Sequence, residues 1–192
     1  MKLFSSALVF FLSLQSLAGL GEDFRDLRHT GADFEVVGTV CEEVTRLRFQ
    51  EEFPAPRYAV TTGVEYGDGS RTIGELDVVV YEAQTNQVHR VAEVKCWKDN
   101  AGAIAKAHDQ RNRFIRTLKS GRTVYFRSLN SQTQFRKDHF MINQQYMAVA
   151  PKGSKAAGFD RELDYELKEL MQLRQMMIQC QSTQACARPQ RR

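Results

Sequence analysis

Two apolar runs on either side of a short polar segment stand out in the pattern of hydrophobic and polar residues. They lie in GELDVVVYEAQTNQVHRVAEVKCW (residues 74–97), and the polar segment AQTNQ (83–87) between them predicts a β-hairpin. A further strand, RYAVTTGVEY (57–66), precedes the hairpin and is followed by the turn residues GDGS (67–70). Three strands that follow one another so closely predict an antiparallel arrangement.

Three other segments carry apolar residues at the spacing of an amphipathic helix. The first is GADFEVVGTVCEEVTRLRF, residues 31–49. The second is AGAIAKAHDQRNRFIRTLKSG (101–121), in which Gly121 is a natural stop. The third covers about 159–181 and has Asp160 as a candidate N-cap. We therefore expect helices before the three strands, after them and near the C-terminus.

Two shorter strands complete the expected elements, RTVYFRSL (122–129) and QQYMAVA (144–150). We expect the strand that follows the second helix to join the sheet in parallel, through a crossover connection. The order of elements predicts an α/β fold, with a mixed β-sheet flanked by helices and an extra C-terminal helix. The chain length of 192 residues fits one domain, which we expect over residues 19–192 with its core at about 30–150.

The N-terminus has a different pattern, MKLFSSALVFFLSLQSLAGLG. One lysine, an apolar stretch and then small residues are typical of a secretory signal peptide, which we place at residues 1–18 with cleavage after Ala18. A retained anchor or a buried first helix is the alternative. The signal peptide predicts a secreted or periplasmic protein, and no other segment approaches membrane-spanning length.

Composition adds one constraint, through the cysteines. Hydrophobic residues make up 42% and charged residues 26% of the chain, as in ordinary globular proteins. An even number of cysteines fits an oxidising compartment. We favour a bridge between Cys180 and Cys186, which are close in sequence, and this leaves Cys41 with Cys96; four independent thiols are the alternative. No C-x-x-C spacing occurs, which argues against a structural zinc site.

Charged residues interrupt the two apolar runs of the hairpin, and they suggest chemistry. Glu75 and Asp77 share one face of their strand, and Glu93 and Lys95 share one face of the next. Folding about the polar segment brings Asp77 to within about one residue of Glu93, and facing side chains lie ~5 Å apart. Adjacent carboxylates repel each other, and two of them with a backbone carbonyl such as that of Val94 suit Mg²⁺. Lys95 could then orient or deprotonate an attacking water.

The motif GELD followed by EVK resembles the active-site signature of the PD-(D/E)XK nuclease superfamily, which has the restriction-endonuclease-like fold. The resemblance implies an αβββαβ core over roughly residues 30–150. It also implies that Asp77 and Glu93 bind the metal ion, helped by the Val94 carbonyl, and that Lys95 is the catalytic lysine. The expected products carry a 5′-phosphate and a 3′-hydroxyl.

The resemblance extends to three further residues. Family members often have a glutamate on the first helix, where GADFE offers Glu35, and some have a glutamine on the following helix, where Gln110 fits. Glu75 matches a common companion of the aspartate. Leu76 stands where the family name has proline, a frequent substitution. The predicted signal peptide is unusual for this family, whose members mostly act on DNA inside cells.

The second predicted helix is strongly basic, although the whole chain has a net charge of only +4. A positive surface beside the candidate site would attract a phosphate backbone. We expect functional contacts foremost from Lys106 and Arg111, whereas an ordinary solvated helix face is the alternative. The basic residues from 106 to 122 are Lys106, Arg111, Arg113, Arg116, Lys119 and Arg122.

These observations predict an exported nuclease that depends on Mg²⁺, with Mn²⁺ as the other candidate ion, and that acts on DNA rather than RNA. Two alternatives stay open. One is a secreted nucleic-acid-binding protein with an inactive nuclease fold, and the other is a disulfide-stabilised envelope protein. An exposed edge hairpin, in which Asp77 and Lys95 form a structural ion pair, would fit either alternative.

Overall fold

The computed structural model describes residues 19–140 and 144–189, so the predicted signal peptide lies outside the described residues. The chain divides into two compact units. The sheet unit comprises Cys41–Leu167, and the terminal unit comprises the described residues up to Val40 and from Lys168 onward. The single domain expected over residues 19–192 stays a prediction.

The sheet unit is built on a six-stranded mixed β-sheet in the order β4-β1-β2-β3-β5-β6. Antiparallel pairs join β1 to β2, β1 to β4 and β2 to β3, whereas β3 and β5, and β5 and β6, are parallel. This confirms an α/β fold with a mixed sheet and the three antiparallel strands. The strands are β1 (Tyr58–Gly67), β2 (Thr72–Glu82), β3 (Val88–Val94), β4 (Tyr125–Ser128), β5 (Gln145–Ala150) and β6 (Arg161–Glu162).

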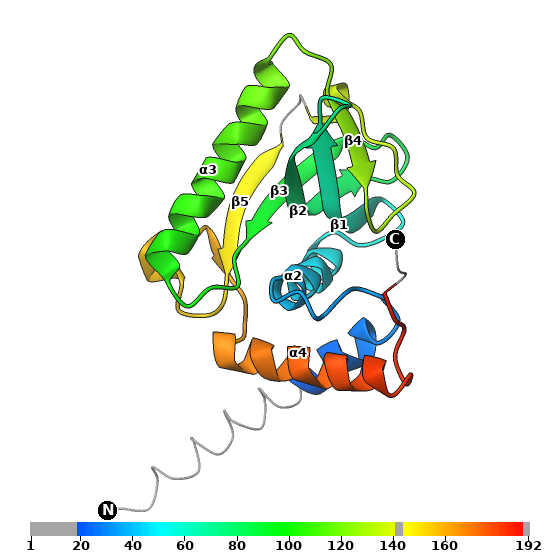
Figure 1. Ribbon diagram of the computed structural model, residues 1–192, viewed down its shortest axis with the longest axis vertical. Coiled ribbons are helices and arrows are strands. Elements are labelled where there is room, and N and C mark those ends of the chain that lie inside the picture. Colours follow the sequence, from blue (N-terminus) through cyan, green and yellow to red (C-terminus); the bar gives the residue numbers. More distant parts are fainter. Residues whose placement is uncertain (1–18, 141–143, 190–192) are drawn as a thin grey trace, which may run out of the picture. The chain divides into compact units, whose positions relative to one another are not determined.

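Helices α2 (Thr39–Glu52) and α3 (Asn100–Lys119) flank the sheet on opposite faces. Two neighbouring residues of β3 show this. Val91 packs in the core cluster that includes Phe114 of α3, whereas the guanidinium of Arg90 lies over Phe49 of α2, 5.4 Å from its ring centroid. The carboxylate of Asp99 caps α3 by accepting hydrogen bonds from its first turn. Figure 1 shows α3 running beside β5, where its first half packs against the strand through alanines.

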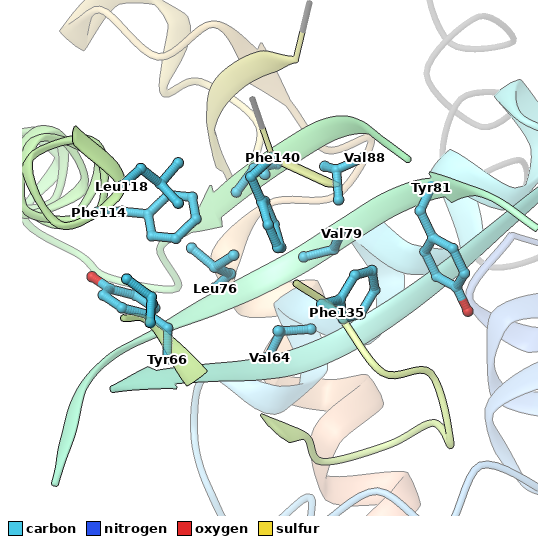
Figure 2. Close-up of a cluster of buried hydrophobic side chains, with 12 residues drawn as sticks. Val64, Tyr66, Leu76, Val79, Tyr81, Val88, Phe114, Leu118, Phe135 and Phe140 are labelled. Atoms are coloured by element: carbon cyan, nitrogen blue, oxygen red, sulfur yellow. The ribbon is translucent and has the colours of Figure 1, made fainter. Parts of the chain in front are cut away.

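The main core cluster lies between the second half of α3 and the sheet. Figure 2 shows Phe114 and Leu118 of α3 beside Leu76 of β2 and Tyr66 of β1. The Phe114 ring lies 4.8 Å from the Tyr66 ring and 5.3 Å from the Phe140 ring, measured between centroids. Such aromatic packing fixes the C-terminal half of α3 over the β1–β2 hairpin.

Strand β2 departs from strict alternation close to Asp77. Leu76 and Val79 are three residues apart, yet both belong to the main core cluster. On the neighbouring strand, Thr62 pairs with Val78 and Val64 with Leu76, which leaves Gly63 across from Asp77. Gly63 has φ +66°, a left-handed conformation that favours glycine. This irregularity changes which side chains of β2 share a face.

Replacing Gly63 with alanine should therefore destabilise the protein by about 1–3 kcal/mol, the usual cost of a non-glycine residue in this conformation. The new Cβ would also lie 3.2 Å from Glu75 Oε1. Chemical denaturation would measure the loss. Gly121→Ala is the matched control, because a Cβ there meets no atom within 4 Å. Equal stability of the two variants would contradict this account.

Two predicted helices begin later than expected. Helix α2 begins at Thr39, not near residue 31, and the residues before it form turns. Helix α4 (Leu167–Ser182) begins well after residue 159, and the intervening residues include β6. Asp160 does not cap α4; its carboxylate accepts a hydrogen bond from the backbone N–H of Ala148, at 2.8 Å.

The crossover prediction was wrong for the strand that follows the second helix. That strand is β4, which pairs antiparallel with β1 at the far side of the sheet, where Arg127 forms an ion pair with Glu65. The parallel partner of β3 is the next long strand, β5. The predicted boundaries of 122–129 shorten to Tyr125–Ser128, and those of 144–150 to Gln145–Ala150.

The terminal unit contains helical residues 19–27 and nearly all of α4. Cys180 and Cys186 form a disulfide there, as predicted. The buried side chain of Gln181 donates hydrogen bonds to the carbonyls of Ala32 and Ala187, both at 2.9 Å, and so joins the two chain segments of this unit. None of the described helices has the length and apolar character needed to cross a bilayer.

Candidate functional site

The β2–β3 hairpin brings together the charged residues on which the sequence analysis depends. Val78 pairs with Ala92, so Asp77 and Glu93 are the next residues along the two strands. Lys95 follows the last residue of β3, and its backbone N–H donates a 2.9 Å hydrogen bond to the carbonyl of Val149. The predicted proximity of Asp77 and Glu93 is confirmed.

The ammonium group of Lys95 lies at the centre of this cluster. Its Nζ is 3.1 Å from Asp77 Oδ2, 3.6 Å from Glu93 Oε2 and 3.0 Å from the carbonyl oxygen of Val94. Asp77 Oδ2 also accepts a 2.7 Å hydrogen bond from the Val94 backbone N–H. The cluster is buried, since Asp77 is 9%, Glu93 3% and Lys95 6% exposed.

Burial and mutual repulsion make this cluster unfavourable for negative charge. Burial raises the pKa of the Asp77 carboxyl, although Lys95 and the Val94 N–H act in the opposite direction. Burial and the neighbouring Asp77 raise the pKa of Glu93 to about 9, against the effect of Lys95. One lysine therefore does not fully compensate the two carboxylates.

A third carboxylate, Glu42 of α2, interacts with the same cluster and was missed by the sequence analysis. Burial raises its pKa to about 8, and repulsion from Asp77, Glu75 and Glu43 adds to the shift, whereas Lys95 lowers it. Burial therefore dominates, and the further causes show that Glu42 lies within electrostatic reach of Asp77 and Lys95.

A signal for Glu42 was present in the sequence. The predicted bridge between Cys41 and Cys96 is confirmed, with 5.8 Å between the two Cα atoms. Glu42 directly follows the first of these cysteines, and Lys95 directly precedes the second. The bridge therefore tethers the helix that carries Glu42 to the strand end that carries Lys95.

Glu35, the helix glutamate proposed from the resemblance, has a different setting. It lies in a turn before α2, in the terminal unit, and its side chain is exposed. Its backbone carbonyl accepts a hydrogen bond from the guanidinium of Arg174. The prediction that Glu35 lies on the first helix was wrong, and Glu42 is the glutamate of α2 that interacts with Asp77.

Three other predicted site residues lie on α3. Lys106 is exposed and Arg111 is half-buried, so both place positive charge at the surface of this helix. Gln110 lies between the buried residues Ala107 and Phe114 in the helical repeat, on the face toward the sheet. Its Oε1 is buried and accepts no hydrogen bond from the described residues. The structure gives no hydrogen bond or ion pair between these three residues and Asp77 or Glu93.

The donor set fits a hard divalent cation. Glu93 Oε2 is buried and accepts no hydrogen bond from the residues that the structure describes. Oxygen atoms of Asp77, Glu93 and the Val94 carbonyl surround one ammonium group, and oxygen ligands are what Mg²⁺ prefers. Across residues 19–140 and 144–189, no three acidic, histidine or cysteine side chains lie together in a way that could hold a metal ion.

Comparisons of this chain with protein-family models, curated proteins and solved structures found no match. The resemblance to the PD-(D/E)XK superfamily therefore stays a prediction from the motif.

Proposed function

We propose that this protein is an exported, Mg²⁺-dependent nuclease that hydrolyses phosphodiester bonds, DNA in preference to RNA. The observation that carries the proposal is the buried cluster of Asp77, Glu93 and Lys95, in which the carboxylates are undercompensated and Glu93 Oε2 accepts no hydrogen bond from the described residues. The Lys95 Nζ, at 3.6 Å, forms an ion pair with this oxygen but does not donate a hydrogen bond to it, and a buried carboxylate oxygen without a hydrogen bond is costly.

Each residue has a role that its contacts support. The Val94 N–H holds the Asp77 carboxylate in place, so Asp77 and Glu93 would bind the ion together with the Val94 carbonyl. Glu42 would help to bind the ion or its water, the role that the resemblance implied for Glu35. Lys95 would position the attacking water. When bound, Mg²⁺ would supply a positive charge that stabilises the developing negative charge on the phosphate oxygens.

The surroundings support a phosphate-bearing substrate and an extracellular setting. Helix α3 begins five residues after Lys95 and carries the basic residues predicted to meet nucleic acid. Two disulfides fit an oxidising compartment, where exported proteins fold. An αβββαβ core of the restriction-endonuclease type is part of the same proposal.

Incubation of the purified protein with plasmid and linear DNA tests the proposal. We expect cleavage with Mg²⁺ or Mn²⁺ and none with a chelator, with 5′-phosphates on the products. DNA that is bound but intact would favour the inactive binding protein instead. DNA that is neither bound nor cut would favour the envelope protein.

Metal binding can be measured without activity. Mg²⁺ should stabilise the protein against thermal unfolding, by about 2.7 kcal/mol at 100 times its dissociation constant. Because protons compete with the ion for carboxylates, the effect should grow as the pH rises toward about 9, the raised pKa of Glu93.

Glu42→Gln tests the added ligand in this assay, and the variant should lose most of the Mg²⁺-dependent stabilisation. Glu51→Gln is the control, because Glu51 lies on the same helix in an exposed ion pair with Arg48. A Glu42→Gln variant that gains as much stability from Mg²⁺ as the control would remove Glu42 from the site.

A further inference from the structure

A cavity of about 300 Å³ lies at the C-terminal end of α3, apart from the carboxylates. One wall is the β1–β2 hairpin, with Gly67 and Asp68, and the other is formed by α3 and the segment after it. Three arginines line it: Arg113, Arg116 and Arg122. This volume is at the lower end of the range for small-molecule sites, so it suits one compact group.

The three guanidinium groups form no ion pair with the described residues. The structure gives their side chains neither a hydrogen bond nor an ion pair with the residues it describes, although ion pairs are found for Arg46, Arg90 and Arg127. Two hydroxyl groups of the cavity are already engaged, because Thr117 donates to the Arg113 carbonyl and Ser120 to the Thr117 carbonyl. The guanidinium groups are therefore the donors that a ligand would meet.

The C-terminal dipole of α3 does not account for this concentration of charge. Basic residues in a last turn often compensate the carbonyl groups at a helix end. Here the backbone N–H of Ser120 bonds to the carbonyls of Arg116 and Thr117, and Lys137 Nζ donates to the Ser120 carbonyl at 2.6 Å. These hydrogen bonds to the helix end come from groups other than the three cavity arginines.

Asp68 is the acidic residue of the cavity wall, and its side chain accepts hydrogen bonds from the residues that follow it. Its Oδ1 accepts hydrogen bonds from the Ser70 N–H, the Ser70 hydroxyl and the Arg71 N–H. These bonds lower the pKa of Asp68 to about 2, so it stays ionised and opposes only part of the arginine charge. The cavity keeps a net positive charge.

We propose that this cavity binds a phosphate group, held by Arg113, Arg116 and Arg122, at a point separate from the hydrolytic site. Guanidinium groups match the geometry of phosphate oxygens and bind them through paired hydrogen bonds. The source of the phosphate is either an internal phosphodiester of a nucleic acid strand or a terminal or free phosphate.

The spacing favours a phosphate of the same nucleic acid that the proposed nuclease cuts, and to that extent the inference rests on the proposed function. Ile73 lines the cavity, and Asp77 is four residues further along β2, about 13 Å at ~3.3 Å per residue. One strand of duplex DNA presents a phosphate about every 3.4 Å along the axis. Because the strand winds around this axis, its phosphates lie further apart than the axial rise, so the cavity would hold a phosphate fewer than about four nucleotides from the scissile bond.

Titration without metal tests the site independently of cleavage. With chelator present, inorganic phosphate should shift the backbone amide resonances of Thr117, Ser120 and Thr123 in NMR spectra. A duplex oligonucleotide without terminal phosphates should shift the same resonances if an internal phosphodiester is bound. A shift seen only with a 5′-phosphorylated duplex or free phosphate would identify a terminal phosphate as the ligand. No shift with any of these probes would overturn the proposal.

Arg116→Gln and Lys119→Gln form a matched pair, because both remove a charge from the last turn of α3 but only Arg116 lines the cavity. Arg116→Gln should weaken binding of the duplex about tenfold and should make log K less steeply dependent on log[salt], by up to ~0.9 in slope. Lys119→Gln should have a clearly smaller effect. Equal effects would show diffuse attraction and would overturn the cavity site.

The two proposals fail separately. Duplex DNA that occupies the cavity but is never cut with Mg²⁺ would support the phosphate site and overturn the nuclease. DNA that is cut, with Arg116→Gln and Lys119→Gln binding equally, would support the nuclease and overturn the phosphate site.

Discussion

Lys95→Ala should lower the rate of DNA hydrolysis by about 10²–10⁴-fold, the usual contribution of a positioned acid–base group. Its Nζ contacts both Asp77 and Glu93, so its loss removes the group that would position the attacking water. Cleavage of plasmid under single-turnover conditions measures the effect. Lys98→Ala is the control, because Lys98 is an exposed lysine three residues further along the chain.

A loss of folding must be separated from a loss of chemistry in this variant. Without the ammonium group, Asp77 and Glu93 would be buried with no cation, and breaking such a pair commonly costs about 3–5 kcal/mol. Mg²⁺ should recover much of this stability but none of the activity. Asp77→Asn is the companion test, since it keeps the shape of the side chain and should also abolish cleavage. Cleavage by Lys95→Ala at the rate of the Lys98→Ala control would overturn the assigned role.

The two disulfides should differ in how much they stabilise the protein against unfolding. The bridge Cys41–Cys96 closes a sequence separation of 55 residues, and in the chain-entropy treatment it should contribute about 4 kcal/mol. The bridge Cys180–Cys186 closes a separation of 6 residues and should contribute about 2 kcal/mol. Urea denaturation of the two double serine variants measures both values.

Activity distinguishes the two bridges further. Because Cys41 and Cys96 adjoin Glu42 and Lys95, their double serine variant should lose most DNA cleavage even where it is still folded. The Cys180→Ser/Cys186→Ser variant should retain cleavage at temperatures well below its unfolding transition. Similar activity in the two variants would mean that the first bridge does not hold the site together.

The hairpin and its charged residues could be predicted from sequence because the information is local. The short polar segment between two apolar runs fixes the turn, and the turn fixes which residue of β2 lies beside Glu93. The expectation was right to within one residue, since Asp77 and Glu93 continue the observed register. The disulfide pairing was also local in part, because Cys180 and Cys186 are close in the chain.

The start of α2 was predicted too early because Phe34 and Val37 continue the helical spacing of Val40 and Val44. In the structure both residues lie in turns before Thr39, and Val37 is 50% exposed. Periodicity counts apolar residues without knowing which of them are buried. Because of this error, Glu35 and not Glu42 was chosen as the glutamate of the first helix.

The errors at β4, β6 and Asp160 have a different origin, in pairing between distant segments. β4 joins the sheet beside β1, with Arg127 facing Glu65 from 62 positions away. Asp160 was expected to cap α4, but its carboxylate accepts a hydrogen bond from the backbone of Ala148, next to the parallel pair of β5 and β6. Local patterns do not contain such partners, because the sheet order decides them.

The position of the Lys95 ammonium group bears on whether the protein can fold before it binds a metal ion. This ammonium group already supplies a positive charge among the buried carboxylates, so the core can form while no inorganic cation is present. In the proposed function, an incoming divalent ion would bind the carboxylates beside this ammonium group. If the proposed function holds, folding would not require the metal ion, and the ion would be needed for activity alone.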